Sequence, residues 1–104
     1  MSTEQLIAVL VELRQASIAI SSSSELRAVM DKYDMMFLGE NFNNIYSLEL
    51  RHALSNSFGI NVSNDELNSL IPVACNSLGM KITPMAAVDD LQNPKPVCYQ
   101  ILLW

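Results

Sequence analysis

Residues 47–67 read SLELRHALSNSFGINVSNDEL, and this stretch decides which fold the sequence predicts. Its first half repeats apolar side chains at four-residue steps, which predicts a helix over residues 47–58. That apolar stripe consists of Leu50, Leu54 and Phe58. Gly59 follows at the position where a helix end favours a positive φ. Ser63 and Glu66 then have the spacing of a capping box, which begins a second helix after a short loop.

Helical patterns extend to both sides of this stretch. A wide apolar stripe predicts a helix over residues 1–20 that is either deeply buried or shared with a partner. Further helices are expected over residues 25–37 and after Thr83, where Pro84 would take the first helical position. Because the main elements are all helical, the predicted fold class is all-α.

The chain divides at a run of four serines and at its last prolines. Consecutive serines favour a linker, because their hydroxyls compete for backbone hydrogen bonds. The apolar end of the chain is equally consistent with a short strand and with an anchor packed on the body. The expected segments are an N-terminal helix (1–20), a serine linker (21–24), a helical pair (25–93) and an apolar C-terminal tail (94–104).

Residues 49–54 (ELRHAL), followed by Gly59 and by residues 63–67 (SNDEL), resemble the second half of an EF-hand lobe of the calmodulin and myosin light-chain type. The resemblance covers about two thirds of the chain. It implies two EF-hand-like helix-loop-helix units that pair through short loop strands. In that arrangement Ile45 and Ile82 take the aliphatic position by which the two loops pair.

Neither loop has the ligands that a calcium ion requires. A calcium loop supplies oxygen ligands from alternate positions and has glycine at its sharp turn. The first loop, residues 38–49, has only Glu40 and Glu49 as carboxylates at ligand positions. The second loop, residues 75–86, has no carboxylate and carries Lys81. The resemblance therefore implies a lobe that works without calcium, and we expect no metal and no cofactor.

The same resemblance implies a light-chain-like protein that binds an amphipathic, basic (IQ-type) helix of a larger partner such as a myosin heavy chain. Six methionines and a net charge of −5 suit such a partner. The expected groove residues are Met30, Met36, Leu54, Ile71, Met85 and Val88. The alternative is a helical adaptor or homodimerisation module, whose interface would combine the first helix with residues 99–104.

Composition disfavours several other classes of protein. With 6 Lys and Arg against 11 Asp and Glu, the chain lacks the phosphate footprint of a nucleic-acid-binding protein, including a winged-helix DNA-binding protein. No apolar run is long enough to span a bilayer, so no membrane insertion is expected. His52 is the sole histidine and the carboxylates are scattered, so we expect no enzyme. Cys75 and Cys98 lack metal-ligand spacing and predict reduced thiols in a cytoplasmic protein, associated with the cytoskeleton if it is light-chain-like.

Overall fold

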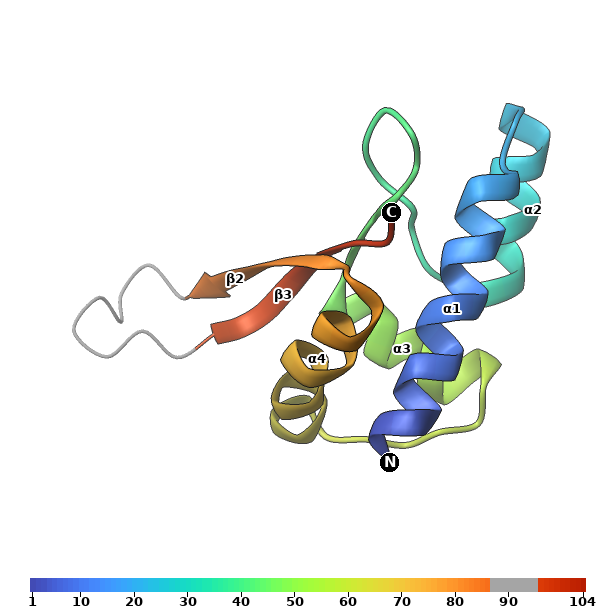
Figure 1. The fold of residues 1–104 in the computed structure, drawn as a ribbon. Helices are drawn as coiled ribbons and strands as arrows, with labels where there is room; N and C mark the ends of the chain where they lie inside the picture. The colour runs from blue at the N-terminus through green and yellow to red at the C-terminus, as the bar shows by residue number, and fades with distance from the viewer. Residues whose placement is uncertain (87–95) are drawn as a thin grey trace.

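Four helices and a three-stranded antiparallel sheet form the part of the chain described by the computed structural model, residues 1–86 and 96–104. The elements are α1 (Thr3–Ala19), α2 (Ser23–Tyr33), β1 (Asn44–Tyr46), α3 (Ser47–Ser57), α4 (Asn64–Leu78), β2 (Lys81–Ala86) and β3 (Pro96–Leu102). In Figure 1, α2 follows α1 and runs back in the opposite direction, while β2 and β3 project from the helices as a two-stranded arm.

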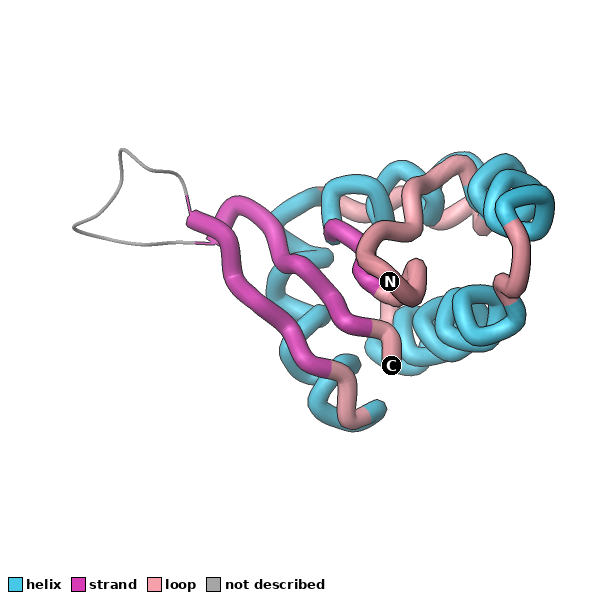
Figure 2. Tube along the Cα trace, turned by 90° about the horizontal axis from the view of Figure 1, so that it is seen from above, coloured by secondary structure: helices cyan, strands magenta, loops and turns pink. Residues whose placement is uncertain are grey.

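The last strand in the sequence lies in the middle of the sheet. The strand order is β1-β3-β2, and both pairs are antiparallel (Figures 1 and 2). Ile101 of β3 stands opposite Ile45 of β1 on one side and opposite Ile82 of β2 on the other. The all-α class expected from the sequence is therefore wrong, and the fold is α+β.

The EF-hand-like pairing of two loops does not form, because β3 separates Ile45 from Ile82. Each isoleucine is paired with the C-terminal strand instead. This strand offers more backbone hydrogen-bond partners than two short loops could offer each other. Of the two alternatives for the apolar C-terminal residues, the structure has the strand rather than the anchor, and this strand is the central one of the sheet.

The helix expected after Thr83 is also wrong in its described part, because residues 81–86 form the edge strand β2. Pro84 stands opposite Tyr99, whose N–H donates to Ser47 Oγ on the far side of β3 (2.8 Å). This pair therefore has no hydrogen bond across β2 and β3, and the nitrogen of Pro84 lies on the open edge. A proline is tolerated at that place in an edge strand.

The helix expected over residues 25–37 ends early, at Tyr33. Asp34 adopts a left-handed conformation (φ 51) as the C-cap, and the N–H of Met35 donates to the Met30 carbonyl (3.3 Å). The chain then turns inward and buries the side chains of Met35 and Phe37. Burial of these two apolar side chains stabilises the turn against continuation of the helix.

The core fills the space between α1, α3, α4 and the sheet. Its fully buried aliphatic side chains include Leu6, Leu10, Leu13, Ile45, Leu50, Leu54, Leu67, Ile71 and Ile101. As the sequence predicts, Ser63 caps α4 by accepting from the Glu66 N–H (3.1 Å). Gly79 ends the helix with φ 70. The two helices of the central stretch, α3 and α4, thus lie where the sequence predicts them, whereas the helices expected over residues 25–37 and after Thr83 needed correction.

The order β1-α3-α4-β2-β3, with β3 central in the sheet, is the connectivity of a winged helix. In DNA-binding proteins with a helix-turn-helix, the second helix, here α4, enters the major groove. α4 contains no Lys or Arg, and Asp65 and Glu66 stand in its first turn. This helix therefore lacks the cations that contacts with phosphate require.

Candidate functional site: the outward face of α3

The candidate site is the outward face of α3, on the opposite side from its buried leucines. Four exposed side chains recur there at helical spacing, so they form one stripe. They are Leu48, Arg51, His52 and Ser55. Two neighbouring depressions lie along this stripe, and His52 lines both of them.

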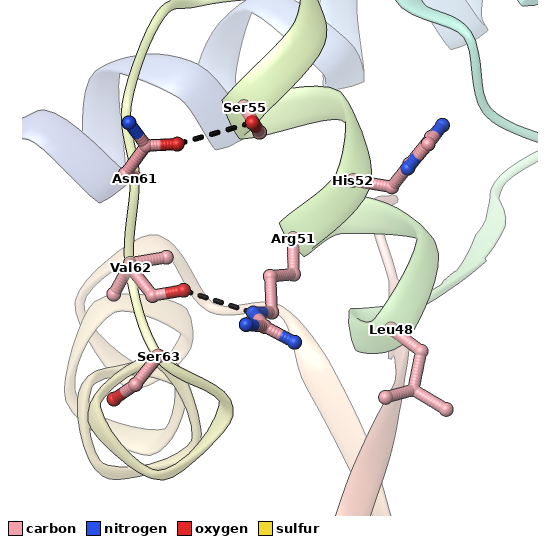
Figure 3. Close-up of a pocket in the computed structure, with 7 residues that line it drawn as sticks. All are labelled: Leu48, Arg51, His52, Ser55, Asn61, Val62 and Ser63. Atoms are coloured by element: carbon pink, nitrogen blue, oxygen red, sulfur yellow. Dashed lines mark hydrogen bonds between the residues drawn. The ribbon is translucent and has the colours of Figure 1, made fainter.

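The first depression is open, has a volume of about 530 Å³ and lies between α3 and the loop before α4 (Figure 3). Its lining consists of Leu48, Arg51, His52, Ser55, Asn61, Val62 and Ser63. Arg51 Nε donates to the Val62 carbonyl (2.9 Å), and Ser55 Oγ donates to Asn61 Oδ1 (3.1 Å). These two bonds join the loop to α3. In Figure 3, the His52 side chain points away from Val62 and from the Arg51 guanidinium.

The second depression, of about 320 Å³, lies where α2 meets α3. It is lined by Met30, Asp34, Met35, Met36, Glu49 and His52. The lining of the second depression differs from that of the first, because the thioethers of its three methionines lie beside the carboxylates of Asp34 and Glu49. Glu49 accepts a hydrogen bond from the Met36 N–H, which fixes one carboxylate beside the exposed thioether.

A small polar cluster holds the boundary between the two depressions. His52 Nε2 lies 2.9 Å from Asp34 Oδ2, and Asn56 Nδ2 donates to the same oxygen (3.0 Å). The hydrogen bond from Asn56, and then that from His52, lower the pKa of the Asp34 carboxyl below its usual value of 3.8. Asp34 is therefore an anion at neutral pH, which is the state needed to attract a cation.

The six residues expected to line one groove are dispersed in the structure. Met30 and Met36 do come together, because both line the second depression. Leu54 and Ile71 are fully buried in the core, and Met85 is exposed on β2. Val88 lies outside the described residues. The EF-hand-like groove is therefore replaced by a methionine-lined depression that contains two of its expected members.

Sequence reasoning missed Leu48 and Arg51 as site residues. Both lie in the stretch that carried the EF-hand resemblance, on the face of the helix opposite its buried apolar stripe. The available signal was Leu48 itself, an apolar residue that stands on the polar stripe of an amphipathic helix. A large apolar side chain at such a position indicates a contact surface.

A third depression, of about 500 Å³, lies between the C-terminal half of α4 and β2. It is lined by Pro72, Val73, Asn76, Ser77, Met80 and Ile82, so no ionisable side chain contributes to it. Elsewhere, burial raises the pKa of the Cys75 thiol to about 11, and Cys98 is also a buried free thiol. Within residues 1–86 and 96–104, no three His, Cys, Asp or Glu side chains are arranged so that they could hold a metal ion.

Comparison with known proteins found no matching family model, no matching curated protein and no matching solved structure. None of the helices in the described ranges combines the length and the apolar character needed to cross a bilayer.

Proposed function

We propose that this protein is an interaction module that docks a short amphipathic segment of a larger protein on the outward face of α3, without calcium. The observation that carries this proposal is the exposure of Met36 (51%) and Leu48 (48%) in two adjoining depressions. Side chains of this size are otherwise mostly buried in this fold, and an exposed apolar pair in concave surroundings favours a docking surface.

The second depression suits a basic side chain of the partner. A Lys or Arg stem would pack on the thioethers of Met30 and Met36, and its charged head would meet Asp34 or Glu49. The partner type expected from the sequence, a basic amphipathic helix, is therefore retained in the proposal. The groove of a light-chain lobe is not retained, because its expected residues are dispersed.

Nucleic acid is disfavoured as the partner by charge, although the connectivity is that of a winged helix. Residues 47–78, which include both α3 and α4, contain one Arg, no Lys and three acidic residues. Binding to duplex DNA rests on neutralisation of phosphates by Lys and Arg. The helix-turn-helix part of this chain would repel the duplex rather than attract it.

Self-association is a second candidate, supported by a contact at the other end of the molecule. Trp104 Nε1 donates to Ser17 Oγ (2.8 Å), which brings the C-terminal segment against α1. Trp104 is 47% exposed, and Ile18, which follows Ser17 in α1, is 58% exposed. A second copy of the chain would cover both side chains. Sedimentation equilibrium should then show a dimer for the wild type and a monomer for Ile18→Lys.

The proposed function is tested by titrating isotopically labelled protein with two designed amphipathic peptides of about 15 residues, one built from Leu and Lys and one from Leu and Glu. We expect the basic peptide to bind and to shift the amide resonances of Met36, Leu48 and Glu49. A fluorescent DNA duplex of similar concentration should show no change in anisotropy at moderate salt.

Two lysine variants with matched exposure locate the surface. Leu48→Lys should abolish binding of the basic peptide, because it adds a cation and removes the apolar contact. Val73→Lys, at a site of similar exposure (57%) on α4, should bind like the wild type. Resonance shifts centred on Pro72 and Ile82, or binding of the duplex in place of the peptide, would contradict the proposal.

A further inference from the structure

We propose that Arg51 binds a carboxylate of the docked segment, so that the partner lies on the α3 face in one direction only. This inference rests on the proposed function and specifies the partner further: an apolar segment with a basic end and an acidic end.

Arg51 is a cation held in place without an acidic partner. Its Nε donates to the Val62 carbonyl, which fixes the guanidinium over the first depression and leaves the two Nη groups to bind elsewhere. None of the ion pairs within the described part of the chain involves Arg51. The other Lys and Arg side chains in the described ranges likewise form no ion pair, and Arg51 is set apart by the hydrogen bond that holds its guanidinium over the first depression.

The guanidinium is also suited to a carboxylate by its shape and surroundings. Its two Nη groups can donate in parallel to the two oxygens of a carboxylate, and such bidentate pairs are stronger than single bonds. Leu48 lines the same depression and is half exposed, so the residue beside the carboxylate would have an apolar contact.

The two depressions therefore differ in the sign of the charged side chains that line them. The first presents Arg51, whereas the second presents Asp34 and Glu49, and His52 lies at the boundary. A segment with an acidic side chain at one end and a basic side chain at the other satisfies both depressions in one orientation. In the reversed orientation it would meet like charges at both ends, which disfavours binding.

The inference is tested with two peptides of equal length and equal apolar content, one basic throughout and one with a basic half and an acidic half. Wild-type protein should bind the mixed peptide about 10-fold more tightly, as a charge-assisted bidentate contact predicts. Arg51→Glu should reverse this preference. Arg27→Glu, an equal change in net charge at an exposed site on α2, should leave the preference unchanged.

Orientation is measured with a spin label placed at either end of the mixed peptide. A label at the acidic end should broaden the amide signals of Leu48 and Asn61, and a label at the basic end those of Met36 and Glu49. Equal binding of both peptides, with no effect of Arg51→Glu, would overturn the inference and leave the proposed function standing. If neither peptide binds, the proposed function itself fails.

Discussion

At the residue scale, Ser17 joins three segments that are far apart in the sequence. Its buried hydroxyl donates to the Phe42 carbonyl (2.6 Å) and accepts from Trp104 Nε1 (2.8 Å). Asn43 strengthens the same junction, because its Nδ2 donates to the Trp104 carbonyl (2.7 Å) and its carbonyl accepts from the Leu103 N–H (2.8 Å). One small polar side chain thus connects α1, the loop before β1 and the end of the chain.

Replacement of this hydroxyl should therefore be costly. Ser17→Ala leaves the Trp104 indole N–H and the Phe42 carbonyl without their partner, so we expect the free energy of unfolding to fall by about 1–3 kcal/mol in urea denaturation. Ser77→Ala is the control, because Ser77 is exposed and bonds only within α4, to the Val73 carbonyl. Equal destabilisation by both changes would mean that the junction is open in solution.

Cys75 gives a second prediction at this scale, one that depends on pH. Burial disfavours the thiolate and raises the pKa from 9.0 to about 11, so the folded protein binds the proton more tightly than the unfolded chain does. The resulting stability is fully present below pH 9 and is lost as the pH rises through 11. The measurement is thiolate absorbance near 240 nm in Cys98→Ala, minus that of Cys75→Ala/Cys98→Ala, which cancels the tyrosinate signal. A midpoint near 9 in folded protein would contradict this account.

At the scale of elements, what the sequence could reveal was limited to local structure. The bounds of α3 and the caps of α4 follow from residues within a few positions of each other, such as Ser63 and Glu66. The partners of Ile45 and Ile82 depend on Ile101, far along the chain, and no local pattern specifies such a pairing. The pair Thr83-Pro84 can begin a helix, and it can equally lie in an edge strand. Here it lies in the edge strand β2, because β2 pairs with β3.

The candidate site was predictable only in part, for a similar reason. Of the six residues expected to line the groove, Met30 and Met36 lie together in the second depression, whereas the surroundings of each leucine depend on the fold. The spacing of Leu50, Leu54 and Phe58 separates Leu54 from Leu48, but only the fold shows that Leu48 borders a depression.

These two leucines of α3 provide a matched prediction. Leu54→Ala removes a fully buried side chain and should lower the free energy of unfolding by about 2–5 kcal/mol, because a cavity remains. Leu48→Ala, at a site 48% exposed, should cost no more than about 0.5 kcal/mol and should instead weaken binding of the basic peptide. Urea denaturation and peptide titration of both variants test the assignment. A severe loss of stability in Leu48→Ala would place that side chain in the core.

At the scale of the whole molecule, the fold is closed by its last residues. β3 pairs with both β1 and β2, contacts α3 and α4, and contributes Ile101 to the core. Without β3, the two outer strands would have no neighbour, and isolated strands of this length are not stable in water. The helices would at the same time expose the apolar side chains that now face the sheet.

A truncation distinguishes this architecture from the all-helical one. Removal of residues 96–104 should abolish cooperative unfolding and expose apolar surface, measured by far-ultraviolet circular dichroism and dye binding. Removal of Trp104 alone is the control: it breaks the bonds to Ser17 and Asn43, so we expect a folded protein that is less stable by about 1–3 kcal/mol. If the helical pair were stabilised by its own loops alone, the protein would keep its helix content and a cooperative unfolding transition after removal of residues 96–104. That result would mean that β3 is dispensable. Loss of cooperative folding after the longer deletion would instead show that the C-terminal strand holds the helices and the sheet together.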